Sequence, residues 1–290
     1  MAVPTVHHHA VASALLEAGL DLLVEKPLAT SLAEADDLIH LAEADAGRGP
    51  RILQPGHLER FNPAVLAVQP RLRRPMFFEA HRLSIFTPRS LDVDVVLDLM
   101  IHDLDIVLTF ANSPVREVRA VGLPILSPKV DIANVRVEFE SGCVANFTAS
   151  RVSTERVRKL RFFEPRQYVS IDYARRELLV IKLDSGTPGS LSPEIAALLA
   201  SGKADPAVLA QLATGGHPSP GLSFMKPEVP PGEPLRLEIE SFLESVRTRR
   251  EPRVTARQGR DALGLALEIQ STMVAHAHRA GLDNFFEAGA

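Results

Sequence analysis

Two short apolar runs between helix-forming segments mark the first 57 residues, and this alternation constrains the fold more than any other feature of the chain. Residues 10–18 form a strong helix pattern that ends before Gly19, where a helix-terminating glycine belongs. Residues 20–24 and 52–54 have the composition of buried strands, and Thr30 or Ser31 can cap a second helix between them. Alternating helices and buried strands predict a parallel sheet built from βαβ units.

Later segments alternate polar and apolar residues with the period of two expected of strands. They cover residues 76–86, 115–125, 133–140, 144–150, 157–163 and 168–182. We therefore expect a second α/β domain over residues 58–290, with a large, mostly antiparallel open sheet backed by helices. Residues 184–234 gather Gly, Pro and Ser and predict an extended loop or lid.

Composition excludes several classes of partner. The net charge of −4 gives no field that would recruit nucleic acid or an anionic membrane. No apolar stretch approaches the roughly 20 residues that span a bilayer. The single cysteine, Cys143, cannot form an intrachain disulfide, which fits a reducing compartment, and we expect a cytoplasmic protein.

Asp98 and His102 stand four residues apart in a helix-like segment, with Asp105 one turn further on. On a helix these side chains share one face, and a carboxylate beside a histidine suits acid and base chemistry. The alternative is a carboxylate at a helix N-terminus with a packed histidine.

Lys26 closes an early apolar run, at the edge where open α/β sheets bind ligands. A lysine there can hydrogen-bond a substrate hydroxyl, and the alternative is a surface lysine in a turn. We expect Lys26 to converge with Asp98 and His102 on one cavity.

A metal site is not predicted. The adjacent residues His7, His8 and His9 cannot easily converge on one ion, and no recognised zinc spacing accompanies them.

Three motifs carry a resemblance to a known family. The first links residues 4–8, 16–19 and Glu25-Lys26-Pro27, the second is residues 56–63, and the third is Asp98-x-x-x-His102-x-x-Asp105. Together they resemble the glucose-fructose oxidoreductase / inositol dehydrogenase / MocA (Gfo/Idh/MocA) family, and similarity continues through the closing helices.

The resemblance implies a sugar or sugar-nucleotide dehydrogenase that uses NAD or NADP. It implies that His102 is the general acid/base, that Lys26 assists the substrate hydroxyl and orients the nicotinamide, and that Asp98 positions or shares the proton. The implied cofactor-binding residues are Pro4, Thr5, His8, Glu25 and Lys26. The implied substrate-binding residues are Arg60, Asn62 and Asp105.

No G-x-G-x-x-G segment occurs in the chain, although such a loop holds the cofactor pyrophosphate in this family. The resemblance therefore implies an N-terminally truncated member, through a misassigned start or a real deletion. Residues 1–57 would be the second part of an incomplete Rossmann-like dinucleotide-binding domain.

Residues 57–64 and 98–105 look most like the subgroup that acts on UDP-N-acetylglucosamine at C3. One alternative is a non-catalytic relic that serves as a binding or dimerisation module, and a metal-dependent hydrolase is another. An apolar sheet face needs cover, so we expect a homodimer or homotetramer through the C-terminal sheet.

Overall fold

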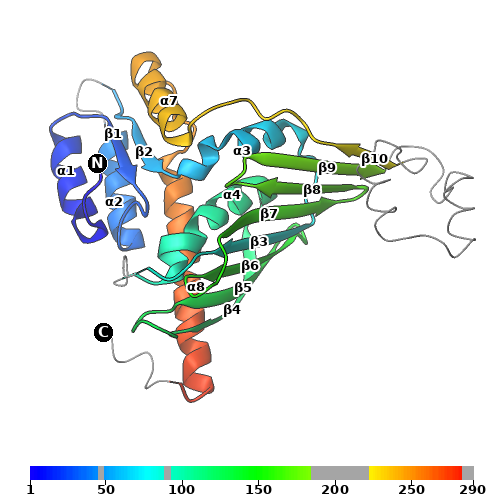
Figure 1. Ribbon diagram of the computed structural model, residues 1–290. Coiled ribbons are helices and arrows are strands. Elements are labelled where there is room, and N and C mark those ends of the chain that lie inside the picture. Colours follow the sequence, from blue (N-terminus) through cyan, green and yellow to red (C-terminus); the bar gives the residue numbers. More distant parts are fainter. Residues whose placement is uncertain (45–48, 88–92, 184–221, 283–290) are drawn as a thin grey trace, which may run out of the picture.

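The computed structural model describes residues 1–44, 49–87, 93–183 and 222–282, and Figure 1 shows their arrangement. The predicted loop 184–234 falls largely outside this part of the chain. Among the described residues, no helix is long and apolar enough to cross a membrane.

The first unit contains a short parallel sheet packed against two helices. Its elements are η1 (Thr5–His7), α1 (His8–Glu17), β1 (Leu22–Glu25), α2 (Leu32–Glu43) and β2 (Leu53–Gly56). β1 and β2 run parallel, with Leu22 opposite Leu53. Of the two predicted caps, Ser31 caps α2, because its hydroxyl accepts a hydrogen bond from the Glu34 N–H at 3.2 Å.

A large mixed sheet forms the second unit. Its strands are β3 (Phe77–Leu83), β4 (Val115–Leu123), β5 (Ile132–Phe139), β6 (Val144–Ser150), β7 (Val157–Glu164), β8 (Gln167–Asp172), β9 (Glu177–Leu183) and β10 (Leu222–Met225), in the order β10-β9-β8-β7-β3-β6-β5-β4. The β3–β6 pair is parallel and every other neighbouring pair is antiparallel. The predicted fold class is therefore confirmed.

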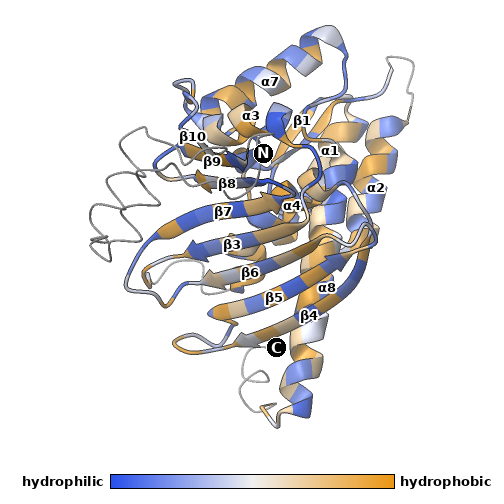
Figure 2. Cartoon of the chain, turned by 90° about the vertical axis from the view of Figure 1, so that its right-hand side faces the viewer, coloured by the Kyte–Doolittle hydropathy of each residue, from blue (hydrophilic) through white to orange (hydrophobic). Residues whose placement is uncertain are grey.

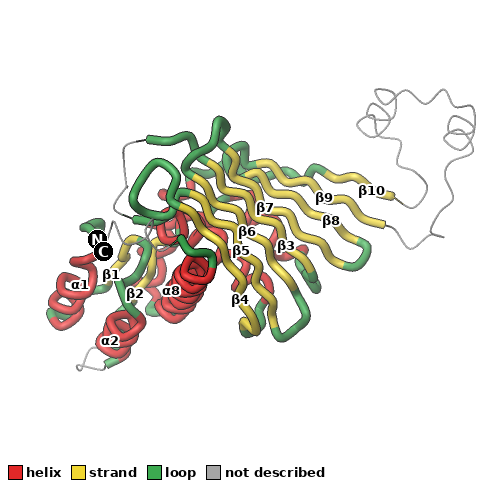
Figure 3. The backbone as a smooth tube through the Cα atoms, turned by 90° about the horizontal axis from the view of Figure 1, so that it is seen from below, coloured by secondary structure: helices red, strands yellow, loops and turns green. Residues whose placement is uncertain are grey.

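Helices cover one face of this sheet (Figures 1 and 3). They include η2 (Leu58–Phe61), α3 (Pro63–Val68), η3 (Gln69–Arg71), η4 (Val96–Met100), α4 (Ile101–Ala111) and α8 (Ala256–Arg279), whereas α7 (Pro234–Thr248) packs against η2. Inward-facing residues alternate along the strands, as at Val135, Val137 and Phe139 of β5, and form the main core. Figure 2 looks onto the opposite face, with α4 and α8 behind the strands.

The helix α8 joins the two units. Leu263 belongs to the core of the first unit, whereas Leu265 and Ile269 belong to the core under the large sheet. At Gly259 the helix approaches β2 so closely that a Cβ atom there would lie 2.4 Å from the Pro55 ring. Any larger residue would push α8 away from the parallel sheet. The predicted boundary between residues 57 and 58 stays a prediction.

Two sequence predictions need correction. The segment 168–182 is two strands, β8 and β9, because the chain turns back at residues 173–176, where Arg176 has a positive φ. The segment around Asp98 begins as a π-helix, η4, before the regular helix α4. Apolar periodicity detects neither a tight turn nor a wider helical turn, so both were invisible in the sequence.

A buried ion cluster holds α4 to the sheet. The Arg82 guanidinium on β3 donates to both Asp103 carboxylate oxygens, at 2.7 and 3.0 Å, and to Glu59 Oε1 at 3.0 Å. It also lies over the Tyr173 ring, 5.2 Å from the centroid. Arg82 and Asp103 are nearly inaccessible to solvent, so the cost of burying each charge is offset mainly by the opposite charge of the other.

Replacing Asp103 by Ala should therefore lower the free energy of unfolding by about 3–5 kcal/mol, because Arg82 would stay buried with half of its partners. Urea denaturation measures this loss. The control is Glu240→Ala, which breaks the exposed Arg236–Glu240 pair and should leave stability nearly unchanged. Equal losses in the two variants would contradict this account.

Candidate active site

The Lys26 side chain connects the end of β1 to the π-helical turn. Its Nζ atom donates hydrogen bonds to the backbone carbonyls of Leu97, at 3.2 Å, and Asp98, at 2.7 Å. Asp98 Oδ1 lies 3.6 Å from the same nitrogen. The structure thus brings together Lys26 and Asp98, which are 72 residues apart in sequence. π-Helical turns are frequent at functional sites, which fits this location.

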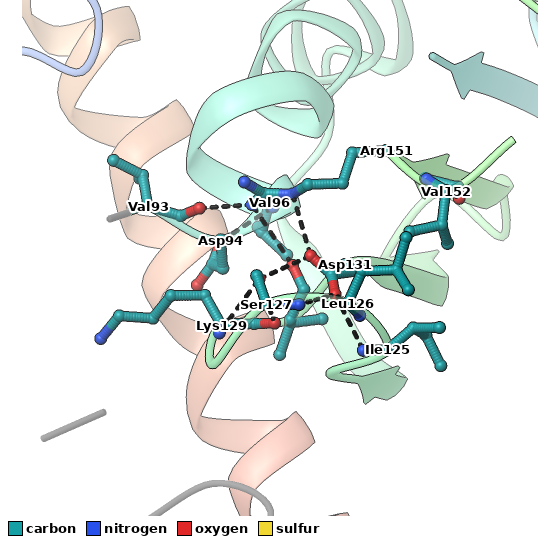
Figure 4. A network of polar contacts seen from close by, with 12 residues as sticks. Val93, Asp94, Val96, Ile125, Leu126, Ser127, Lys129, Asp131, Arg151 and Val152 are labelled. Atoms are coloured by element: carbon teal, nitrogen blue, oxygen red, sulfur yellow. Dashed lines mark hydrogen bonds and ion pairs between the residues drawn. The ribbon is translucent and has the colours of Figure 1, made fainter. Parts of the chain in front are cut away.

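A polar network fixes the backbone that leads into this turn (Figure 4). Asp131 Oδ2 accepts three backbone N–H bonds from residues 125–127, at 2.6–2.8 Å. Burial raises the pKa of Asp131, but these bonds and the Ser127 hydroxyl outweigh burial and leave the pKa below its ordinary value. Arg151 pairs with Asp131 and donates to the carbonyls of Val93 and Val130.

Asp94 completes this support by capping the π-helical turn. Its Oδ1 atom accepts hydrogen bonds from the N–H groups of Val96, at 2.8 Å, and Leu97, at 3.1 Å. Its other oxygen accepts from the Gln270 amide on α8. The turn that carries Asp98 is consequently held from both the sheet and α8.

His102 lies one turn after Asp98 and is half-buried, with a buried Nδ1 atom that has no hydrogen-bond partner. Burial lowers its pKa well below the ordinary value, and the positive charges of Lys26 and Arg82 lower it further. The imidazole is therefore neutral at pH 7 and can accept a proton. Because the unfolded chain still binds this proton near pH 6.5, His102 reduces stability as the pH falls below that value.

Burial also lowers the pKa of Lys26, although the nearby carboxylates of Asp98 and Glu25 oppose this effect. Glu25 itself is exposed at the end of β1, and its carboxylate packs over Gly56. A Cβ atom at Gly56 would lie 3.2 Å from Glu25 Cα and Oε2 and 3.3 Å from the Val24 carbonyl, so a side chain there would force β1 to shift by a few tenths of an ångström.

Other predicted cofactor-binding residues lie near the same edge. The buried His8 has Nδ1 2.8 Å from the Pro27 carbonyl and Nε2 3.0 Å from the Val3 carbonyl. His8 therefore links the N-terminal segment to the residue that follows Lys26. Pro4 is exposed and Thr5 is half-buried at the start of η1. Cofactor contact by these residues stays a prediction.

The three predicted substrate-binding residues are buried and engaged within the protein. Asn62 caps α3 and donates to Glu59 Oε2 at 3.1 Å. Arg60 donates to Gln258 Oε1 at 3.1 Å and lies 3.8 Å from Asp105 Oδ2. The structure does not present their bonded atoms to an open site, and substrate contact by them stays a prediction.

Sequence reasoning assigned no role to two residues beside this site. His57 is 1% exposed, and its Nδ1 atom lies 3.9 Å from Asp105 Oδ2. Arg158 of β7 is exposed, stands opposite Arg82 in the sheet, and contributes to the low pKa of His102. The period of two along β7 could have identified Arg158, because it places this residue on the same face of the sheet as the buried Leu160 and Phe162.

Comparisons with known proteins agree with this architecture. Residues 1–48 match a family described as "Oxidoreductase family, NAD-binding Rossmann fold", and residues 64–166 match the GFO/IDH/MocA C-terminal domain. The UDP-N-acetylglucosamine 3-dehydrogenase of Acidithiobacillus ferrooxidans is 33% identical over 277 residues, which are 95% of this chain and 78% of that protein.

A solved structure of the same dehydrogenase from that organism superimposes with a TM-score of 0.78 at 32% identity, over 94% of this chain and 78% of the other. An inositol 2-dehydrogenase of Acidothermus cellulolyticus is 32% identical over 126 residues, 41% of this chain and 36% of that protein.

A Rossmann-type parallel sheet followed by a helix-backed mixed sheet defines a nicotinamide-dependent oxidoreductase. This chain belongs to the Gfo/Idh/MocA family.

The charge environment of His102 predicts its titration. In wild-type protein the imidazole should titrate below pH 6.5, and Lys26→Met should raise its midpoint because one positive neighbour is removed. Histidine Cε1–H NMR shifts report both values. Lys159→Met, on the opposite face of β7, should leave the midpoint in place. A wild-type midpoint at or above 6.5 would overturn this reading.

Proposed function

We propose that this protein oxidises the C3 hydroxyl of UDP-N-acetylglucosamine, or of a closely related sugar nucleotide, with NAD or NADP. The observation that carries the proposal is the convergence of Lys26 and the Asp98–His102 helix at the carboxyl edge of the parallel sheet. The 33% identity to a UDP-N-acetylglucosamine 3-dehydrogenase over 95% of the chain supports the choice of substrate.

The residues at this edge fit the nicotinamide end of the cofactor, because a half-buried ammonium and a neutral histidine with an unpartnered Nδ1 stand together there. A nicotinamide held at this edge would supply the acceptor for the hydride of the sugar carbon. His102 takes the hydroxyl proton, while the Lys26 ammonium stabilises the oxygen as its negative charge develops. Asp98 keeps Lys26 charged and oriented, and the sugar leaves as a ketone.

Positive charge around His102 suits a substrate that carries phosphate groups. Lys26 and Arg82 are engaged within the protein, whereas Arg158 is exposed and has no ion-pair partner among the described residues. A guanidinium can bind a diphosphate through two parallel hydrogen bonds. Arg158 is thus the residue we assign to the diphosphate of the sugar nucleotide.

Assembly is part of the same proposal. The open face of the large sheet carries a row of half-buried rings: Phe77 and Phe163 have centroids 5.4 Å apart, and Phe163 and Tyr168 have centroids 5.2 Å apart. A second copy of the chain would remove these rings from water, which favours a homodimer or homotetramer through this face.

Turnover tests the function directly. The 290-residue chain, and the same chain with a βαβ unit carrying G-x-G-x-x-G joined before Met1, are incubated with UDP-N-acetylglucosamine, UDP-glucose or inositol and with each cofactor, while absorbance at the reduced nicotinamide band is followed. We expect UDP-N-acetylglucosamine to give the fastest turnover and a C3 ketone by NMR, and His102→Ala to lose roughly 10²–10⁴-fold in kcat. His40→Ala, an exposed histidine on α2, is the control. Absence of sugar-nucleotide turnover in both proteins would refute the proposal.

Loss of the Arg158 charge should weaken binding more than chemistry. Arg158→Ala should raise KM for the UDP-sugar about tenfold with little change in kcat, since one charged contact to phosphate is worth about 1.4 kcal/mol or more. Lys159→Ala removes the same charge from the opposite face of β7 and should leave KM unchanged. A similar KM in the two variants would exclude Arg158 from the phosphate site.

A further inference from the structure

Several buried polar atoms around His57 lack hydrogen-bond partners. Gln54 is 0% exposed with both amide atoms unpartnered, and His57 is 1% exposed with both ring nitrogens unpartnered. Arg60 Nη1 and Asp105 Oδ2 are also buried and unpartnered. Buried polar atoms are almost always hydrogen-bonded, so a cluster of this kind indicates ordered water between the side chains.

His57 lies next to Asp105, which follows His102 on α4. Its Nδ1 atom is 3.9 Å from Asp105 Oδ2, a gap that a small shift of the ring or one water can close. Burial and then the charge of Lys26 lower the pKa of both His57 and His102, and the charge of His57 also acts on His102, so the two imidazoles lie within electrostatic range of each other. His102 and Asp105 are three residues apart on α4 and share one helix face.

Asp105 in turn lines a cavity of about 1030 Å³ between α4 and α8. Other polar residues of its lining are Thr109, Gln258, Arg260 and Glu268. Asp105 therefore belongs both to the buried polar cluster and to the lining of this cavity.

A proton taken up by His102 must reach bulk water before the next turnover, so a path for it through the protein is required. Protonated His102 is unfavourable beside Lys26 and Arg82, and bound substrate would cover its exposed side. The unpartnered Nδ1 atom faces the protein interior, where bulk water has no direct access.

We propose that His57 and Asp105 relay protons between His102 and the cavity between α4 and α8. The relay rests on the proposed dehydrogenase function. During oxidation the hydroxyl proton binds His102, which releases a proton from Nδ1 through water to the unprotonated nitrogen of His57. His57 passes the proton on its other nitrogen to Asp105, and water in the cavity removes it. This transfer leaves each imidazole as its other tautomer, and exchange with water, in which one ring nitrogen loses a proton and the other gains one, restores the starting state. One proton leaves per turnover.

The first test does not depend on turnover. In wild-type protein, water in the relay should make the His102 ring N–H exchange rapidly with solvent, as measured by ¹⁵N NMR with selective water saturation. His57→Gln and Asp105→Asn should each slow this exchange about tenfold. Thr109→Val, which alters the lining of the same cavity, should leave it unchanged. Unchanged exchange in both relay variants would overturn the proposal.

The second test uses steady-state kinetics of the protein that turns over the UDP-sugar. His57→Gln should lower kcat about tenfold at unchanged KM, a smaller loss than removal of the primary base. The solvent deuterium isotope effect should rise and the isotope effect of a C3-deuterated sugar should fall, since proton release becomes limiting. A purely structural role would leave both isotope effects as in the wild type, and that result would also refute the relay. Slowed exchange in a protein without sugar-nucleotide turnover would uphold the relay and refute the proposed function alone.

Discussion

The Lys26 ammonium, held by two carbonyls of the π-helical turn, is the contact on which the rest of the site depends. An ammonium withdrawn from water must find acceptors, and the nearest ones belong to a helix from the other unit of the molecule. That requirement fixes the parallel sheet against η4 and sets the distance between Lys26 and Asp98. It also places a positive charge beside His102, and burial together with this charge lowers the pKa of the imidazole, which is therefore neutral and able to accept a proton.

The residues of α4 that stabilise the fold and those proposed to act in catalysis lie on different faces of the helix. Asp103 faces the sheet and neutralises Arg82, so that side of the helix is committed to stability. Asp98 of η4 lies beside Lys26, and Asp105 of α4 lies beside His57, with His102 between them in sequence. The continuous segment of η4 and α4 thereby carries both a carboxylate that stabilises the fold and the groups proposed to move protons.

The sequence predicted the order of the helices and strands, but it did not predict the contacts of the buried polar side chains. The order of elements and the meeting of Lys26 with Asp98 follow from periodicity and from motifs whose spacing is local. The π-helical turn, the burial of Arg60 and Asn62 and the position of His57 depend on side chains that meet across 40 to 200 residues. Arg60 illustrates the limit: its motif suggested a ligand contact, whereas its donors reach Gln258 of α8, a partner that no local pattern identifies.

The placement of Leu263 has a consequence for how the chain acquires its structure. The core formed by α1, β1 and α2 includes the buried Leu263 of α8, with Ala256 and Leu267 of the same helix packed against it, and these residues lie more than 200 positions later in the chain. The segment of α1, β1 and α2 must therefore wait for α8, with an apolar surface unprotected, before its core is complete. Assembly of the two halves is for that reason a late and concerted event during biosynthesis, and chaperone binding to the nascent N-terminal helices is favoured in the interval.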